Sequence, residues 1–293
     1  MEISNHEKTF KDILKIIPQI KDHHCVNSDL YQFLKKILIN EVEKTYQEKD
    51  TFYFGDFGLI KIPYISFGSI NTKHLFGLDE LIIFSYYILM KNKYKTVIDL
   101  GANIGLHTTL MSKCFSKVIS FEPDDYHFSI LENVINDNNL NNVSLHQLAI
   151  SDISGELEFT RIKGNTTGSH ISGSKENVYG ETEKFNVKCN TLSQVISRFS
   201  PDFVKMDIEG QEKNVITSTP YNLIEKVDLI VEVSNENNAI SLFNYFKNTN
   251  INLFSQKNNW KRVTKIEDMP YSYKDGSLFI SSKNTMEWYD KSI

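Results

Sequence analysis

The chain has 293 residues, with 37 acidic and 32 basic side chains, a formal net charge of −5 at pH 7 and a pI near 5.9. An acidic chain has no basic field with which to gather phosphate backbones, so the charge disfavours a nucleic-acid partner, although a local basic patch would still fit this average. With 40% hydrophobic and 24% charged residues, the composition is typical of a globular protein with one large domain or one domain and an appendage.

Residues 1–94 differ in pattern from the rest of the chain. A largely helical segment, 13–39, contains Pro18, which we expect to interrupt it, and a Gly- and aromatic-rich stretch follows at 52–76. The apolar run 81–90 has about half the length of a membrane span, and the N-terminus has no apolar signal core. We therefore expect a cytoplasmic protein without a membrane span, in which residues 1–94 form an α+β cap for substrate recognition.

From residue 95 to 293 the sequence alternates short β-rich apolar runs with amphipathic stretches, the pattern of βαβ units around a parallel sheet. Strands that are covered by helices on both faces are apolar on both sides. This rule predicts five core strands, at residues 96–100, 117–121, 143–148, 203–207 and 228–233. The sequence thus predicts a doubly wound α/β fold.

Helices are predicted between these strands, and an antiparallel strand pair is predicted near the end. Acidic residues suited to capping open the segment 124–136, which carries apolar residues at helical spacing. The expected helices are residues 104–115, 124–136, 191–198, 212–217 and 240–246, and the expected edge strands are 251–254 and 277–281. The three cysteines, Cys25, Cys114 and Cys189, are widely spaced, which argues against a disulfide framework and a zinc site.

The rhythm of strands and helices is broken between residues 155 and 188. Two β-like pieces, 156–161 and 185–187, flank a polar loop rich in Gly, Asn, Ser and Thr. Long polar loops on a rigid sheet commonly carry function. We therefore expect this insertion to contribute to a binding site.

A glycine-bearing turn, D-L-G-A-N-I-G at 99–105, joins the first predicted core strand to the following helix. In a doubly wound fold this turn faces the ligand crevice at the carboxyl end of the sheet. Gly101 and Gly105 allow a tight turn and a close approach of ligand to the main chain, and Asn103 tolerates the left-handed conformation. The turn predicts a cofactor site that includes Asp99 and Ala102.

Glu122 ends the next predicted strand, 23 positions after Asp99, where an acidic side chain accepts hydrogen bonds from ribose hydroxyls. A nicotinamide dinucleotide would call for glycine at positions 103 and 106, but the chain has Asn103 and Leu106. Asp99 would also repel a pyrophosphate, whereas it suits the ammonium of a methionine moiety. These residues favour S-adenosylmethionine over a nicotinamide cofactor.

A second group of charged residues, K-M-D-I-E-G-Q-E at 205–212, follows the fourth core strand on the same rim. Alternation along the strand places Lys205 and Asp207 on one face. Lys205 is either an acceptor-binding residue or the ion-pair partner of Glu212. For Asp207 and Glu209, at the predicted crevice, we favour a functional role.

The chain resembles the FkbM family of methyltransferases through four motifs in order, D-L-G-A-N-I-G at 99–105, F-E-P at 121–123, A-I-S-D at 149–152 and K-M-D-I-E-G-Q-E at 205–212. The resemblance covers about residues 96–233 and implies a class I, Rossmann-like methyltransferase fold that commonly O-methylates sugars or natural products. Mapped onto these motifs, the expected cofactor residues are Asp99, Gly101, Ala102, Asn103, Gly105, Glu122, Pro123 and Ala149.

Two positions depart from the family pattern. His107 stands where the family usually has an aromatic residue, and Ser193 stands where it usually has aspartate. If that aspartate has a catalytic or structural role, Ser193 puts the role in doubt here. His107 is a candidate proton acceptor, but a lone histidine in the first turns of a helix is more often structural.

Transfer of a methyl group to an alcohol requires removal of the hydroxyl proton. The candidates for this base are Asp207, Glu209, Glu232 and His170. The same three carboxylates could instead hold Mg²⁺, which would polarise the hydroxyl directly, but we favour the route without a metal.

We expect the acceptor pocket to form from the polar loop 163–170, with Asn165 and Lys205 as acceptor-binding residues, and the aromatic stretch near Tyr64, Phe67 and Phe76. Amides and hydroxyls hydrogen-bond a polyol, and aromatic rings pack against the apolar face of a sugar. The predicted acceptor is a small molecule or carbohydrate. A nicotinamide-dependent oxidoreductase and a degenerate cofactor-binding protein are the alternative functions, and the sequence does not fix the oligomeric state.

Overall fold

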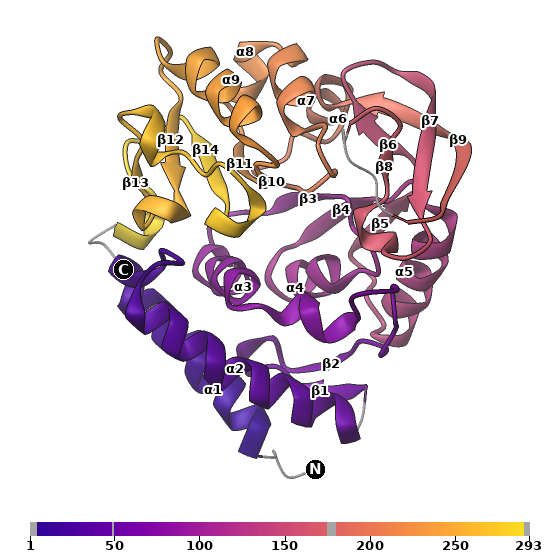
Figure 1. The fold of residues 1–293 in the computed structure, drawn as a ribbon, viewed down its shortest axis with the longest axis vertical. Helices are drawn as coiled ribbons and strands as arrows, with labels where there is room; N and C mark the ends of the chain where they lie inside the picture. Colours follow the sequence, from indigo (N-terminus) through magenta and orange to yellow (C-terminus); the bar gives the residue numbers. More distant parts are fainter. Residues whose placement is uncertain (1–4, 49, 175–179, 290–293) are drawn as a thin grey trace.

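The computed structural model describes residues 5–48, 50–174 and 180–289, and its central feature is an eight-stranded mixed sheet (Figure 1). The strand order is β13-β12-β14-β11-β10-β3-β4-β5. All five predicted core strands are confirmed as its parallel part, namely β3 (Thr96–Leu100), β4 (Lys117–Phe121), β5 (Val143–His146), β10 (Phe203–Met206) and β11 (Asp228–Val231). The chain reverses its direction of growth between β3 and β10, which creates a crevice at the carboxyl ends of these two strands.

The predicted antiparallel pair is confirmed at the other side of the sheet. β14 (Leu278–Ser281) pairs antiparallel with both β11 and β12 (Asn252–Ser255), and the short β13 (Lys261–Arg262) forms the edge. All four residues of β14 are buried because the strand lies inside the sheet, with helices on either side.

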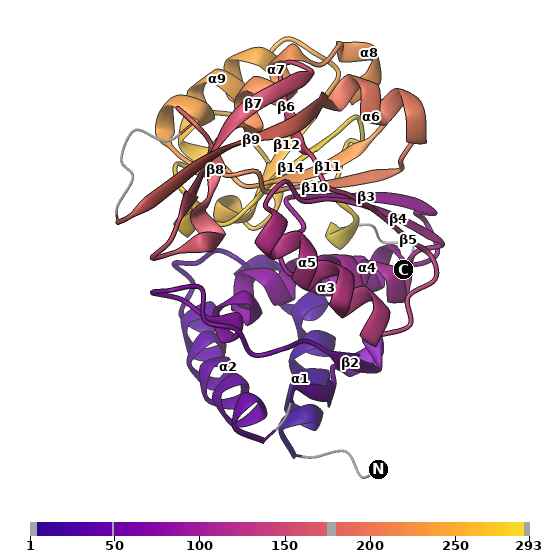
Figure 2. The same ribbon diagram turned by 90° about the vertical axis from the view of Figure 1, so that its right-hand side faces the viewer.

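Helices cover both faces of the sheet (Figure 2). One layer contains α3 (Leu78–Met90), α4 (Leu106–Cys114) and α5 (Asp125–Asp137), and the other contains α6 (Leu192–Phe199), α7 (Glu212–Ser218), α8 (Tyr221–Ile224) and α9 (Glu236–Phe246). The five predicted helices are confirmed with shifted ends. α4 begins two residues late because Gly105 has a φ of 90°, and α9 begins four residues early because the Asn235 side chain caps Asn238 N–H.

The N-terminal region lies on the outer side of α3 and α4 (Figure 2). Its elements are α1 (Asn5–Ile16), η1 (Ile17–His23), α2 (Asp29–Glu48), β1 (Thr51–Tyr53), η2 (Gly55–Phe57), β2 (Leu59–Lys61) and η3 (Thr72–Phe76). The predicted interruption at Pro18 is confirmed, since Pro18 opens the 3₁₀ segment after α1. Residues 1–4 and 49 of the predicted cap lie outside the described residues.

The predicted boundary at 94/95 cuts through a continuous hydrophobic core. Phe10 and Phe54 of the N-terminal region belong to the same buried cluster as Val97 of β3 and Phe203 of β10. Helix α3 supplies the link, because its Tyr87 ring packs edge-on against Phe203. The layer that covers the sheet therefore begins at α3, and residues 5–76 pack on top of it.

The insertion between β5 and α6 forms a second, four-stranded sheet with the order β6-β9-β7-β8 (Figure 1). Its strands are β6 (Ala149–Ser151), β7 (Gly155–Ile162), β8 (His170–Ile171) and β9 (Thr182–Thr191), and the short helix η4 (Thr166–Gly168) lies between β7 and β8. The two β-like pieces expected here are confirmed as parts of β7 and β9, which pair antiparallel. Residues 175–179 of the insertion lie outside the described residues.

The remaining short helices follow β12. They are η5 (Gln256–Asn258), η6 (Ile266–Asp268), η7 (Tyr273–Asp275) and η8 (Glu287–Tyr289). Within the three described stretches of chain, every helix is too short or too polar to cross a membrane.

Candidate active site

The glycine turn after β3 is shaped by two close approaches. Gly101 has a φ of 75°, and a Cβ at this position would lie 1.8 Å from the carbonyl oxygen of Asp207. Gly105 has a φ of 90°, and its Cβ would lie 2.5 Å from Leu131 Cδ1. Asn103 adopts the left-handed conformation that we expected, with a φ of 52°. A side chain at position 101 would collide with backbone, and one at position 105 would be strained by the positive φ, so glycine at both positions lets the main chain form this tight turn.

Glu122 holds this turn from the end of β4. Its Oε2 accepts the backbone N–H of Asn103 at 2.8 Å, and its Oε1 accepts the N–H of Asp124 at 2.9 Å. The side chain is buried, and burial raises the pKa of Glu122 to about 8, although both backbone hydrogen bonds lower it. Each carboxylate oxygen can accept more than one hydrogen bond, so Glu122 can fix the turn and still bind a ligand hydroxyl.

A pocket with about 590 Å³ of empty volume lies between the turn, the end of β4 and the inserted sheet. We call it the cofactor pocket. Its lining contains five of the predicted cofactor residues and the end of β10: Gly101, Asn103, Phe121, Glu122, Pro123, His127, Leu148, Ala149, Ile150, Phe159, Thr166, Thr167, Ser169, Ile171, Asp207, Ile208 and Glu209. Asn103 Oδ1 is buried and has no hydrogen-bond partner among the described residues, so a ligand donor would satisfy it.

Asp99 lies below the turn rather than in the pocket wall. Its side chain is fully buried, Oδ2 accepts the Thr108 hydroxyl at 2.6 Å, and Oδ1 is 3.8 Å from Lys205 Nζ. The direct contact with a methionine ammonium that we expected for Asp99 therefore does not fit its position. Sequence alone does not reveal Thr108 as a partner, because the contact depends on how α4 packs against β3.

Lys205 is a buried cation aimed at the same rim. Its Nζ lies 3.6 Å from Asp207 Oδ2 and 3.8 Å from Asp99 Oδ1, and both distances are longer than a hydrogen bond. Burial opposes its charge, but the carboxylates of Asp207, Asp99 and Glu80 outweigh burial and raise the pKa of Lys205. Lys205 therefore stays charged and has N–H groups available for a ligand oxygen.

The alternative pairing of Lys205 with Glu212 is wrong. Glu212 accepts the N–H groups of Ile208 at 2.9 Å and Gly210 at 3.0 Å. Burial raises the pKa of Glu212 to about 7. Its role is to hold the loop after β10, where Glu209 has a φ of 56°.

The three carboxylates that we predicted as bases converge on this rim, but they differ in environment. Asp207 is partly exposed and lies next to Lys205, and Glu209 lines the cofactor pocket. Glu232 follows β11, where burial and the charges of Asp207 and Glu209 raise its pKa well above the ordinary value. Glu232 thus favours its protonated form and hydrogen-bonds Asp207.

His170 does not join this group. It pairs with Thr160 in the β7–β8 ladder, is buried, and its Nδ1 lies 2.9 Å from the carbonyl oxygen of Gly168. Its neighbour Ile171 lines the cofactor pocket, so strand alternation turns His170 to the opposite face. The prediction that His170 is a base at the rim is not supported by this placement.

The polar loop 163–170 lies against the N-terminal region, as we expected, but it borders the cofactor pocket. Gly68 forms an isolated antiparallel β-bridge with Asn165, while Thr166 and Thr167 line the pocket. Asn165 Oδ1 accepts the Thr167 hydroxyl at 2.8 Å. The aromatic rings expected to touch an acceptor differ in exposure, since Phe67 and Phe76 are buried in the core and Tyr64 is exposed.

The two departures from the family pattern are both engaged locally. The His107 ring nitrogens lie 2.9 Å from the Tyr87 hydroxyl and 3.0 Å from Glu80 Oε2. Ser193 Oγ lies 2.9 Å from the Thr191 hydroxyl, which caps α6. These contacts favour a structural role for both positions.

Three further hollows adjoin the cofactor pocket. One is lined by Leu75, Glu80, Gly101, Ala102, Asn103, Ile104, Leu106, His107, Lys205 and Asp207. Of the other two, the first, the acidic cleft, has about 560 Å³ of empty volume and is lined by Asp79, Glu80, Ile83, Lys205, Met206, Asp207, Ile230, Glu232, Tyr273, Gly276 and Ser277. The second, the amide groove, has about 1430 Å³ and is lined by Gly173, Ser174, Glu209, Gly210, Gln211, Glu212, Lys213, Asn214, Glu232, Ser234, Asn235, Asn237, Asn238 and Tyr273. Asp207 borders the first, and Glu209 borders the second.

Sequence reasoning missed several of these residues. Asp79 and Glu80 open α3, and burial raises the pKa of Asp79 to about 6. Their position immediately before the apolar run 81–90 was the available signal, because acidic side chains are favoured in the first turn of a helix. Among the described residues, no group of three or more His, Cys, Asp or Glu side chains is arranged to hold a metal ion.

Comparison with known proteins gives the family. A family model described as the methyltransferase FkbM domain matches residues 99–256. Similar solved structures include methyltransferase FkbM from Methylobacillus flagellatus KT (16% identity, 64% of this chain and 43% of that chain, TM-score 0.41). Two others are precorrin-6y C5,15-methyltransferase from Geobacter metallireducens GS-15 (8%, 68% and 85%, TM-score 0.37) and an O-methyltransferase from Bacillus cereus (10%, 66% and 76%, TM-score 0.36).

A search of curated protein sequences gives no match. The chain spans less than half of the M. flagellatus protein, 43% of its length. The FkbM match, in contrast, covers more than half of the present chain and contains the glycine turn, Glu122 and the 205–212 motif. This chain therefore belongs to the FkbM family of methyltransferases.

Proposed function

We propose that this protein uses S-adenosylmethionine to O-methylate a hydroxyl of a sugar or another polyol. The observation that carries the proposal is the position of Asp207. Its carboxylate borders both the cofactor pocket and the acidic cleft, and it lies 3.6 Å from the ammonium of Lys205. A base and a positive charge thus meet beside the cofactor pocket.

The residues of the cofactor pocket fit S-adenosylmethionine. Glu122 can accept ribose hydroxyls, Asn103 Oδ1 lacks a donor among the described residues, and Ala149 and Ile150 offer an apolar surface to a purine. When bound, this cofactor supplies a methyl group on a sulfonium whose leaving group is a neutral thioether, so the protein needs no acid for it.

Among the predicted bases, Asp207 suits proton removal best. Glu232 favours its protonated form, and His170 faces away from the pocket. Lys205 can donate to the acceptor oxygen and stabilise the negative charge that develops on it. This ammonium supplies the charge that Mg²⁺ would supply, and we therefore favour catalysis without a metal.

The amide groove supports a polyol as the acceptor. It presents the side-chain amides of Asn214, Asn237 and Asn238 together with the exposed ring of Tyr273. Amides both donate to and accept from hydroxyl groups, and an aromatic ring packs against the apolar face of a sugar. We assign acceptor recognition to this groove and, from the first turn of α3, to Asp79 and Glu80 of the acidic cleft.

Cofactor binding is expected to depend on the ionisation of Glu122. A ribose hydroxyl donates best to the ionised carboxylate, so binding should tighten as pH rises through the raised pKa of Glu122, about 8. At pH 7 Glu122 is ionised in only about a tenth of the protein molecules. The Kd for S-adenosylhomocysteine should therefore be about tenfold higher at pH 7 than at pH 9. Calorimetric titrations across this range measure the effect.

The matched control is Glu122→Gln, which keeps the size of the side chain but cannot ionise. Titration of groups on the ligand affects the Kd of both proteins equally, so the difference between their pH profiles reports the ionisation of Glu122. The variant should bind more weakly at high pH and should lose the additional slope. Equal pH profiles for parent and variant would show that Glu122 does not touch the ligand.

Acceptor recognition is tested with a panel of free sugars and sugar alcohols, measured by release of S-adenosylhomocysteine. Asn238→Ala should raise the acceptor KM about three- to tenfold, the effect of one lost hydrogen bond, with cofactor Kd unchanged. Asn244→Ala is the control, since Asn244 is exposed on the same helix, α9, outside the amide groove. No turnover with any polyol, or equal acceptor KM in both variants, would contradict the assignment.

A further inference from the structure

We propose that the β7–η4–β8 segment, residues 155–171, is the roof of the cofactor pocket and that Arg161 is the positioning residue that fixes it there. The inference rests on the proposed use of S-adenosylmethionine. It assigns to cofactor binding a segment that the sequence pointed towards the acceptor, and it gives Arg161 a role that no motif indicates.

The roof supplies one whole wall of the pocket. Phe159 of β7 and Ile171 of β8 are register partners and both line it, and the hydroxyl-bearing residues Thr166, Thr167 and Ser169 line it beside them. The opposite wall carries Gly101 and Glu122. Two apolar side chains and three hydroxyls facing a ribose-binding acid form a surface suited to a nucleoside.

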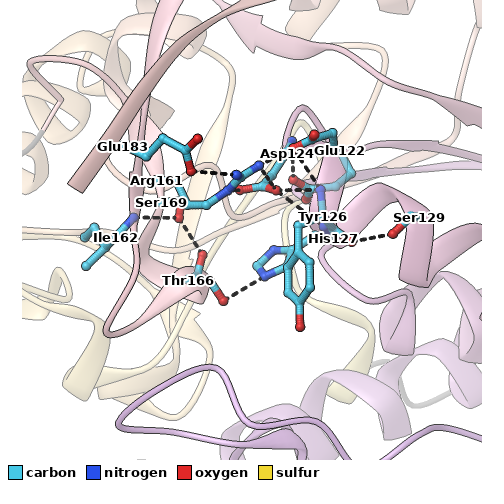
Figure 3. A network of polar contacts seen from close by, with 11 residues as sticks. Glu122, Asp124, Tyr126, His127, Ser129, Arg161, Ile162, Thr166, Ser169 and Glu183 are labelled. Carbon is cyan, nitrogen blue, oxygen red and sulfur yellow. Dashed lines mark hydrogen bonds and ion pairs between the residues drawn. The ribbon is translucent and has the colours of Figure 1, made fainter. Parts of the chain in front are cut away.

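Arg161 joins the roof to the wall that carries Glu122 (Figure 3). Its Nε and Nη2 each donate to the Asp124 carboxylate, at 2.8 Å, and the planar guanidinium stacks 4.6 Å above the Phe185 ring centre. Asp124 is almost completely buried, and its own N–H donates to Glu122. Arg161 also contacts Glu183, at 3.0 Å, and Asp125. A bidentate, largely buried pair is the kind of ion pair that fixes geometry.

A second contact joins the roof to α5. The Thr166 hydroxyl lies 3.0 Å from His127 Nε2 (Figure 3). Burial lowers the pKa of His127 to about 4, so its ring is neutral, and Phe67 packs edge-on against it. The N-terminal region adds backbone bonds, from Thr166 N–H to the Phe67 carbonyl at 3.0 Å and from Ser69 N–H to the Gly164 carbonyl at 2.9 Å. The roof is therefore held by two sets of contacts, and Arg161 is linked to the ribose-binding Glu122 through Asp124.

Loss of the Arg161 pair should weaken cofactor binding without a direct effect on the acceptor. Without the pair the roof is in place for only a fraction of the time, and the apparent Kd rises in inverse proportion to that fraction. If a tenth of the molecules keep the roof in place, the Kd for S-adenosylhomocysteine increases about tenfold. The amide groove is lined by other elements, so the acceptor KM at saturating cofactor should stay within about twofold.

The test compares Arg161→Met, Asp124→Asn and Lys184→Met with the parent by calorimetric titration with S-adenosylhomocysteine at pH 9. At this pH Glu122 is already largely ionised in the parent, so loss of the Asp124 charge, which raises the pKa of Glu122, has little effect on the ionisation of Glu122. Asn caps a helix as well as Asp does, so Asp124→Asn removes the charge while keeping the cap on α5, and it carries the test if Arg161→Met fails to fold. Lys184→Met is the matched control. Lys184, on β9, forms an exposed ion pair at 2.7 Å with Glu158, on β7, the strand that also carries Arg161.

We expect about a tenfold higher Kd for the first two variants, a Kd within about twofold of the parent for Lys184→Met, and partial recovery in Arg161→Lys. Equal Kd values for Arg161→Met and Lys184→Met, or an acceptor KM that rises together with the cofactor Kd, would overturn the role of Arg161. A parent protein that does not bind S-adenosylhomocysteine would instead reject the proposed function, which keeps the two failures distinct.

Discussion

Replacement of Asp207 by asparagine is expected to lower kcat by about 10²- to 10⁴-fold, the usual contribution of a general base. Asparagine keeps the shape of the side chain but cannot accept the hydroxyl proton. Asp207 lies at the border of the cofactor pocket, and its side chain is partly exposed. Loss of its charge should therefore change the Kd for S-adenosylhomocysteine by no more than about threefold. Initial rates of S-adenosylhomocysteine release, at saturating cofactor and acceptor, measure the loss.

Glu232→Gln is the control for this experiment. Glutamine mimics a protonated glutamic acid, and burial together with the charges of Asp207 and Glu209 raises the pKa of Glu232 well above its ordinary value. The variant should therefore keep kcat within about tenfold of the parent. If Asp207→Asn stays within tenfold of the parent while Glu232→Gln abolishes turnover, the base has been assigned to the wrong carboxylate.

Replacement of Gly101 by alanine is expected to disrupt the cofactor site and the fold together. The added Cβ would lie 1.8 Å from the Asp207 carbonyl oxygen, and backbone cannot move aside as the end of a flexible side chain can. The resulting shift of the turn should weaken cofactor binding, and a misplacement of the reacting methyl group by about 1 Å should lower kcat/KM by about 10²-fold. Thermal melting and titration with S-adenosylhomocysteine measure both effects.

Gly58 provides a matched control for this substitution. Its φ is also 75°, but a Cβ there would meet nothing within 4 Å. Gly58→Ala should therefore cost only the backbone strain of this φ with its ψ of −151°, about 1–3 kcal/mol in the free energy of unfolding, with unchanged cofactor binding. Equal losses in the two variants would mean that positive φ, and not the contact with Asp207, explains the requirement for glycine at position 101.

The sheet was predictable because its signals are local. Strands such as β3 and β11 are apolar on both faces. The residues of the glycine turn that indicate a cofactor site are consecutive in the sequence. The residues whose placement differs from the expectation depend on contacts between distant residues. Asp99 reads as a ligand-facing acid, but the Thr108 hydroxyl donates to its Oδ2, and its Oδ1 lies 3.8 Å from Lys205 Nζ inside the fold.

The placements of His170 and of α3 also depend on contacts that the local sequence does not contain. β8 has only two residues, so its sequence cannot indicate which of His170 and Ile171 faces the pocket, and pairing with β7 decides it. The boundary near residue 94 was predicted from a change in the sequence pattern at that point. Helix α3 nevertheless belongs to the layer on the sheet, because its apolar run packs against β10 through Tyr87 and Phe203.

The central claim is that S-adenosylmethionine binds between the glycine turn and the inserted sheet, with its ribose on Glu122. A crystal structure of the protein with S-adenosylhomocysteine tests it most directly. We expect both ribose hydroxyls within hydrogen-bond distance of the Glu122 carboxylate and the purine between Ile150 and Phe159, with Arg161 still paired to Asp124. A ligand bound elsewhere, or one whose ribose does not reach Glu122, would contradict the account.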